Sequence, residues 1–324
     1  MCTAVSFYKN DHYFGRSLDY ERYFGEEVAI APRNFMFDFR FAGIMREHYA
    51  MIGMAHVAEN DPLYYDCVNE KGLAMAGLNF VGNAFFGEPS EGRYALAPHE
   101  FIPFILGQCR DLSEARKMLE NICLVNEPFS KDYPISELHW IISDKSGSLV
   151  VESTEKGFFV YDNPVGILTN NPEFPQQLLQ LNNYMSLSAK PPENRFCSDY
   201  PLKPYSRGMG AIGMPGDWSS ESRFVRAAFI KANSVCGDSE EERVSQFFHI
   251  LAAVENPNGC CQLEDGSYQI TQYICCCNCD KGIYYYNYYN NHQISAVDMH
   301  RANLCSSKLI VIKPETREHF NYRN

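Results

Sequence analysis

The first predicted strand of this chain begins at its second residue, and that residue is a cysteine. Cys2 to Tyr8 and Tyr13 to Gly15 have the pattern of two strands joined by a turn at Asn10-Asp11, so we expect the amino terminus to be held in a sheet. If Met1 is removed, as is usual before a small residue, Cys2 carries a thiol and a free α-amine. With a pKa of roughly 7.7–8.0, that amine can accept the thiol proton near neutral pH. The sequence therefore predicts a nucleophile and its base on one residue at the start of a strand.

A simpler interpretation is that Cys2 is one of thirteen cysteines that happens to fall early in the chain. An odd number of cysteines favours reduced, mostly buried thiols over a disulfide framework. If Cys2 is the nucleophile, we expect it to be the one cysteine that is both exposed and activated, and hence the first to react with alkylating agents.

Charge and hydropathy exclude several classes of function. The net charge of −12 argues against a nucleic-acid partner, because phosphate backbones require clustered Lys and Arg. No leader pattern is found, since Lys9-Asn10-Asp11-His12 follows the short apolar start at once, and no apolar run approaches the roughly 18–20 residues of a membrane span. We therefore expect a cytoplasmic protein without a membrane span. Its 45% hydrophobic and 14% aromatic content suits a large core and an apolar pocket for a bulky ligand.

Two charged residues follow the hairpin closely in Gly15-Arg16-Ser17-Leu18-Asp19. A cation such as Arg16 beside Cys2 would lower the pKa of the thiol, and Asp19 would be able to hydrogen-bond the α-amine and orient it. A surface ion pair between Arg16 and Asp19 is the alternative interpretation.

The remaining pattern is a series of strands with a few helices, and strands dominate the first half. A helix is predicted at Pro98 to Cys109, and Pro103 is expected to kink this helix or to end its first part. Further helices are predicted after a cap at Ser113, at Pro175 to Met185, from Ser219-Ser220-Glu221 onward, and at Glu240 to Val254. Strands are predicted at Glu27 to Pro32, Tyr49 to Met54, Asp66 to Val68, Leu73 to Phe80, Leu138 to Ser143, Leu149 to Ser153, Phe158 to Tyr161, Val165 to Thr169, Gln269 to Cys277 and Ile283 to Tyr288, with Ile294 to Met299 and Leu309 to Lys313 closing the sheet. The polar, proline-rich stretch 188–207 is predicted to be an extended loop or arm.

Three apparent motifs do not predict a site. Cys276 and Cys279 form a Cys-x-x-Cys, but on a strand residues three apart point to opposite faces and do not converge on a metal. The same argument separates Ser6 and Lys9, which have the spacing of a serine-lysine motif. The glycines of 208–213 match a dinucleotide fingerprint but follow a polar arm, so we predict a backbone turn there. We expect no metal and no cofactor.

Five spaced motifs carry a resemblance to a known family. They are Cys2, Gly15-Arg16-Ser17-Leu18-Asp19, Gly77-Leu78-Asn79-Phe80, Leu168-Thr169-Asn170-Asn171-Pro172 and Ser222-Arg223-Phe224-Val225-Arg226. In this order the chain resembles the choloylglycine hydrolase family of amino-terminal nucleophile hydrolases, and the match runs nearly end to end.

The resemblance implies an α+β fold, a four-layer αββα sandwich, formed by a single domain over 1–324 with the arm at about 188–207 projecting. It implies that Cys2 is the nucleophile and that its α-amine is the proton acceptor. Arg16 would stabilise the thiolate, and Asp19 would hold the amine. Asn79 and Asn170 would donate hydrogen bonds to the oxyanion, and Arg223 would complete the polar network. It further implies conjugated bile salts as substrates and a homo-oligomer, a tetramer, in which the arm reaches a neighbour. Alternatives left open are a penicillin V or N-acyl-homoserine lactone acylase, and a relative that keeps Met1 and binds sterols without turnover.

Overall fold

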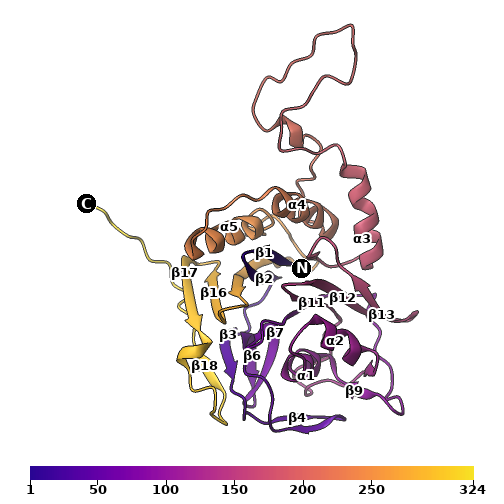
Figure 1. Cartoon of the computed structure of the whole chain (residues 1–324), viewed down its shortest axis with the longest axis vertical. Helices are drawn as coiled ribbons and strands as arrows, with labels where there is room; N and C mark the ends of the chain where they lie inside the picture. Colours follow the sequence, from indigo (N-terminus) through magenta and orange to yellow (C-terminus); the bar gives the residue numbers. More distant parts are fainter.

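Two antiparallel sheets face each other in the computed structural model, which describes all 324 residues (Figure 1). The first has six strands, in the spatial order β14 (Ile167–Leu168), β1 (Cys2–Lys9), β2 (Asp11–Tyr20), β15 (Ile270–Asn278), β16 (Ile283–Tyr288) and β17 (Asn291–Asp298). The second has eight, in the order β13 (Gly157–Asp162), β12 (Gly147–Thr154), β11 (Leu138–Asp144), β8 (Ala74–Asn79), β7 (Asp61–Asn69), β6 (Met51–Ala58), β3 (Glu27–Ala31) and β18 (Ile310–Ile312).

Helices cover the outer face of each sheet. The helices α4 (Ser220–Asn233) and α5 (Glu240–Ala252) pack on the six-stranded sheet, whereas α1 (Phe101–Gln108) and α2 (Leu112–Leu119) pack on the eight-stranded sheet (Figure 1). One apolar cluster fills the space between the sheets and under α4 and α5, and a second lies under α1 and α2. The predicted four-layer αββα sandwich is therefore confirmed.

Smaller elements complete the fold. They are α3 (Phe174–Gln180), the pairs β9 (Tyr94–Leu96) with β10 (Ile122–Leu124) and β4 (Phe37–Phe39) with β5 (Gly43–Met45), and 3₁₀ turns at Pro98–Glu100, Leu181–Tyr184, Met209–Ala211 and Met299–Arg301. The turn at Met209–Ala211 lies in the glycine-rich stretch and agrees with the backbone turn predicted there.

The alternation of side chains along β1 decides what Cys2 faces. Phe7 packs edge-on against Phe247 of α5, with ring centroids 6.4 Å apart, so the odd-numbered residues point to the helices. The Ser6 hydroxyl lies 2.7 Å from that of Ser143 in β11, so the even-numbered residues point to the other sheet. Because side chains alternate along a strand, Cys2 faces the space between the two sheets.

Three local predictions were wrong. Asp111, not Ser113, caps α2, because its carboxylate accepts from the amide of Glu114 at 2.9 Å. Pro103 does not end its helix: it lies in the first turn of α1, where the missing N–H costs no helical hydrogen bond. The last strand, β18, pairs with β3 and so closes the eight-stranded sheet, whereas the segment before it, β17, pairs with β16 in the other sheet.

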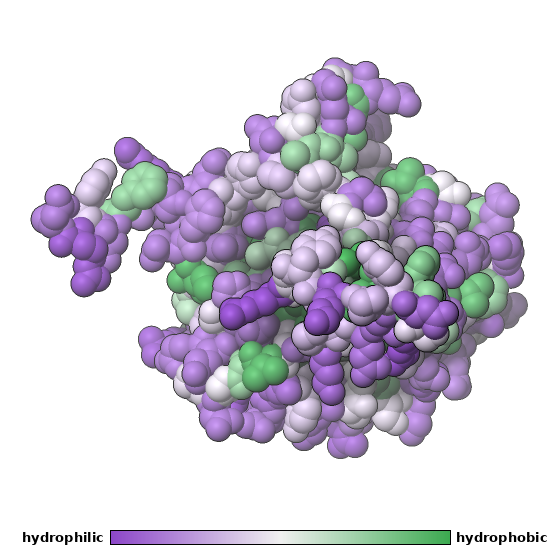
Figure 2. Space-filling model, turned by 90° about the horizontal axis from the view of Figure 1, so that it is seen from above, coloured by the Kyte–Doolittle hydropathy of each residue, from purple (hydrophilic) through white to green (hydrophobic).

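The stretch 188–207 contains no helix or strand and projects beyond α3 and α4 in Figure 1. Its aromatic residues are exposed: Phe196 retains 90% and Tyr205 retains 87% of its accessible surface. Figure 2, viewed from the side of this arm, shows a mostly hydrophilic surface with scattered hydrophobic residues. None of the helices has the length and apolar character needed to cross a membrane.

Candidate active site

Cys2 is the first residue of β1 and is almost fully buried, with 1% of its surface exposed. Its backbone nitrogen, which carries Met1 in this chain, donates a hydrogen bond to Oδ1 of Asn170 at 2.8 Å. The expectation that Cys2 is the exposed cysteine is wrong, because Cys260 and Cys305 are exposed and Cys2 is enclosed between the sheets. Selective labelling of Cys2 therefore cannot rest on accessibility.

Arg16 lies on β2 opposite Ala4 and shares the inner face with Cys2. Its guanidinium crosses to the eight-stranded sheet, where Nη1 donates to the carbonyls of Tyr65 at 3.1 Å and Gly77 at 2.5 Å. Burial lowers the pKa of Arg16, but the neighbouring Cys2 and other acidic groups outweigh it and leave the pKa raised. Arg16 is thus a buried, permanent cation that shares the inner face with the thiol, and it is not part of a surface ion pair.

Asp19 lies on the other face of β2, toward α4, and Arg223 is a residue of α4; both side chains are fully buried. Oδ1 of Asp19 accepts from the hydroxyl of Thr271 at 2.6 Å, while Oδ2 has no hydrogen-bond partner and lies 3.9 Å from Nη1 of Arg223. The Met1 ammonium donates to the backbone carbonyl of Asp19, not to its carboxylate. The predicted contact between Asp19 and the Cys2 amine is therefore absent while Met1 is attached.

Asn170 connects the site. Its Nδ2 donates to the carbonyl of Asn79 at 2.7 Å, and its Oδ1 accepts from Nη2 of Arg223 at 2.7 Å as well as from Cys2. Arg223 also donates through Nη1 to the carbonyl of Cys2 and, at 2.8 Å, to the hydroxyl of Thr3. Asn79 itself is half-buried at the end of β8. Pairing of β1 with β14, in the register Ala4 to Leu168, is what carries Asn170 to Cys2.

The six residues predicted for the site come together from five separate segments: β1, β2, the end of β8, the segment after β14, and α4. Four polar residues that hydrogen-bond to these six residues or to the segment around Asn170 were not predicted from the sequence: Thr3, Thr271, His139 and Glu152. No sequence pattern distinguishes Thr3 and Thr271 from other strand residues. His139, in contrast, is a histidine inside the apolar strand Leu138 to Ser143, and that pattern indicates a buried polar group.

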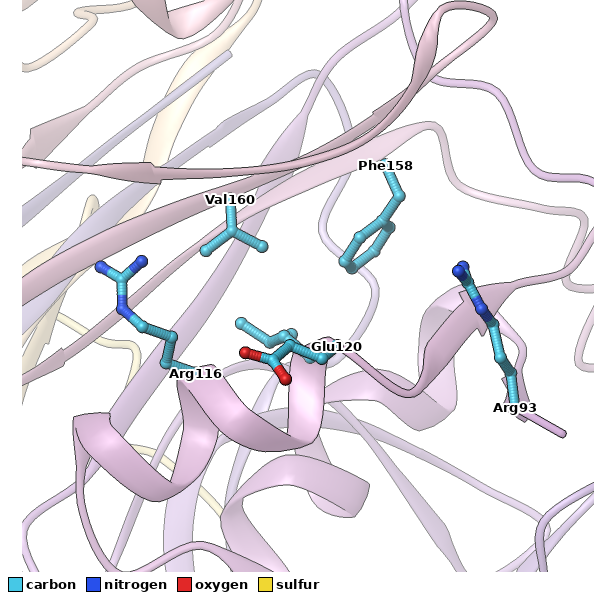
Figure 3. Close-up of a pocket in the computed structure, with 6 residues that line it drawn as sticks. Arg93, Arg116, Glu120, Phe158 and Val160 are labelled. Atoms are coloured by element: carbon cyan, nitrogen blue, oxygen red, sulfur yellow. The ribbon is translucent and has the colours of Figure 1, made fainter.

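Two surface hollows are not lined by Cys2. A hollow of about 500 Å³ between α2 and β13 is shown in Figure 3, with the Glu120 carboxylate between the guanidiniums of Arg116 and Arg93. A smaller one of about 190 Å³ is lined by Tyr23, Gln272, Tyr288, Tyr289, Asn290 and Thr316. Neither contains any of the six site residues, so the apolar pocket predicted for a bulky ligand is not one of these.

No group of three or more His, Cys, Asp or Glu side chains is arranged to hold a metal ion. Cys276 and Cys279 are both buried, and burial raises the pKa of each thiol. Ligands to a metal would have to be thiolates, which this environment disfavours.

A cysteine that begins the first strand of an αββα sandwich, with its backbone nitrogen held in a buried polar network, defines an amino-terminal nucleophile hydrolase. Residues 2–312 match the family model described as linear amide C–N hydrolases, choloylglycine hydrolase family. The chain therefore belongs to the choloylglycine hydrolase family.

Relatives and solved structures agree with this assignment. The chain is 48% identical over 310 residues to a bile salt hydrolase/transferase of Lactiplantibacillus plantarum, covering 96% of each chain. A mutant of the conjugated bile acid hydrolase from Clostridium perfringens matches with a TM-score of 0.92 and 34% identity over 100% of both chains. Penicillin V acylase from Agrobacterium tumefaciens has a TM-score of 0.76 with 18% identity over 97% of this chain and 91% of its own, so it shares the fold.

Proposed function

We propose that this protein hydrolyses the amide bond of glycine- or taurine-conjugated bile salts through a thioester on Cys2. The observation that carries the proposal is the hydrogen bond of 2.8 Å from the Cys2 nitrogen to Asn170, which connects the nitrogen to Arg223 and Asp19 in one buried network. The relatives named bile salt hydrolase/transferase or conjugated bile acid hydrolase support bile salts as the substrate class over nearly the whole chain.

Removal of Met1 supplies the base. The freed α-amine of Cys2 stays next to Asn170, and the unpartnered Oδ2 of Asp19 is an acceptor available to it. Burial lowers the pKa of the α-amine on Met1, so an amine in this environment releases its proton readily and is a competent base. The amine takes the thiol proton, directly or through a water, and Arg16 stabilises the thiolate.

The thiolate then attacks the amide carbonyl, and a tetrahedral oxyanion forms. Asn79 and Asn170 donate to this oxyanion, and losing one such donor costs roughly 3–4 kcal/mol in other acyl-transfer enzymes. The ammonium of Cys2 gives its proton to the leaving nitrogen, the C–N bond breaks, and glycine or taurine departs from the thioester. The amine next deprotonates a water that attacks the thioester, which releases the free bile acid and restores the thiol.

The substrate assignment is tested by kinetics on glycocholate, taurocholate and penicillin V with protein whose intact mass shows that Met1 is absent. We expect a higher kcat/KM for the bile salts, because the sterol offers a large apolar surface to bind. Efficient cleavage of penicillin V with both bile salts inert would refute the substrate and leave the Cys2 mechanism standing. Purified protein that retains Met1 and binds sterols without turnover would refute the hydrolase itself.

We also propose that the chain acts as a single domain in the cytoplasm and assembles as a homotetramer. One apolar cluster shared by both sheets supports a single domain, and thirteen free cysteines suit a reducing compartment.

The exposed Phe196 and Tyr205 on the projecting arm support an interface between subunits of the tetramer there. Replacing both by serine is expected to lower the native mass in sedimentation, and a parent that is monomeric at micromolar concentration would contradict the assembly.

A further inference from the structure

Two fully buried side chains outside the six site residues form a pair beside the active site. His139 lies on β11 and Glu152 on β12, and Nδ1 of His139 is 3.0 Å from Oε1 of Glu152. His139 has the same strand parity as Ile141, which belongs to the cluster between the sheets, so the pair faces the six-stranded sheet.

The pair holds both ends of the segment that carries Asn170. Nε2 of His139 donates to the carbonyl of Thr169 at 2.9 Å, and the carboxylate of Glu152 accepts from the amide of Phe174 at 3.0 Å. Thr169 and Phe174 flank Asn170 on either side. Two residues of the eight-stranded sheet thus fix a segment that belongs to the edge of the other sheet.

The same histidine also contacts the segment of the second asparagine. The ring of Phe80, the residue after Asn79, stacks on His139 with centroids 4.3 Å apart and an interplanar angle of 6°. Because Asn170 donates to the carbonyl of Asn79, the two asparagines and His139 form one connected unit.

Hydrogen-bond chemistry excludes a direct catalytic role for His139. A carbonyl oxygen only accepts, so Nε2 carries a proton that is committed to Thr169, and Nδ1 is occupied by Glu152. Neither nitrogen can exchange a proton with a substrate. What the ring controls is the position of its neighbours.

We propose that His139, oriented by Glu152, is a positioning residue that sets the placement of Asn79 and Asn170 for stabilisation of the oxyanion. This inference rests on the proposed function, because it assumes that the two asparagines donate to the oxyanion. A displacement of about 1 Å at such donors is enough to lower a rate by roughly 100-fold.

The test compares Glu152→Gln with the double variant Glu152→Gln/His139→Phe. A glutamine at 152 can accept from Phe174 through its oxygen and donate through its nitrogen to an unprotonated Nδ1, so the single variant keeps a hydrogen bond to each of these two partners and is the matched control. The double variant keeps a ring to stack on Phe80 and leaves no buried carboxylate unpaired, but it loses the donor to Thr169. We expect kcat on glycocholate within about fivefold of the parent for the control and about 100-fold lower for the double variant, with KM within threefold for both.

A second measurement separates positioning from a loss of structure. A bile-acid aldehyde adds to the Cys2 thiol and places an oxygen at the oxyanion position, so its affinity is expected to fall in step with kcat while binding of the free bile acid is unchanged. Should the double variant fail to fold, His139→Gln is expected to lose about tenfold in kcat at constant KM. A folded variant with parental kcat, or a loss that falls entirely on KM, overturns the inference. Parent turnover that disappears in Cys2→Ala tests the proposed function separately, and a parent inert toward both bile salts overturns both.

Discussion

The two ends of β1 each have a buried histidine, and their surroundings differ. At the Cys2 end, His139 lies between the carboxylate of Glu152 and the carbonyl of Thr169, and the adjoining site contains three further buried charges, Arg16, Asp19 and Arg223. At the other end, the imidazole of His12 has the hydroxyls of Ser6 and Ser143 as partners, each 3.1 Å from Nε2, while the backbone amide of His12 donates to the carboxylate of Asp280 at 2.7 Å. The buried functional groups at the Cys2 end are charged, whereas at the other end the imidazole is bonded to neutral hydroxyls and the carboxylates of Asp280 and Asp144 act on it from nearby.

This difference separates the functional from the structural part of one core. Burying a charge costs several kcal/mol, and replacing a whole buried ion pair by well-packed apolar residues is often neutral or stabilising. Buried charges are retained in an active site because charge develops there during the reaction. Charged groups that are already fixed in place stabilise this developing charge. At the His12 end no such demand exists, and an uncharged imidazole bonded to two serines is sufficient.

The largest effect that the comparison predicts is at Cys2. Cys2→Ala is expected to abolish hydrolysis of bile salts, because the attacking sulfur is gone, and to change the free energy of unfolding by only about 1–2 kcal/mol, since a small buried group is removed. Turnover and thermal unfolding of the same preparation check both parts. Activity within tenfold of the parent would show that the charged end does not serve a Cys2 nucleophile.

Sequence patterns predicted the local parts of this site well and the distant contacts poorly. Cys2 and the hairpin that carries it follow from strand patterns, which are properties of short segments, whereas the candidate asparagines were named only by the resemblance to the family. The crossing of Arg16 to Gly77 and the bond from His139 to Thr169 depend on how two sheets face each other. No local pattern encodes that arrangement, and the burial of Cys2 was missed for the same reason.

At the other end of β1, His12 provides the smaller test. Burial lowers the pKa of His12 from 6.5 to about 4, against the opposing effect of Asp280 and Asp144. Below pH 6.5 the unfolded chain therefore binds a proton that the folded chain does not bind until pH is near 4. Stability must fall as pH drops through this window, and the difference between the two pKa values, at about 1.4 kcal/mol per pH unit, sets a limit of roughly 3.5 kcal/mol.

His12→Gln removes this titration and keeps an amide that can bond to the two serines. We expect the variant to retain parental turnover at pH 7, because His12 lies at the end of β1 away from Cys2, and to lose less stability than the parent between pH 6.5 and 4. Burial also lowers the pKa of His99 to about 4, so a smaller slope of the same sign should persist in the variant. Urea unfolding at several pH values measures both slopes. Equal slopes for parent and variant would mean that His12 is charged in the folded protein, and the contrast between the two ends of β1 would then fail.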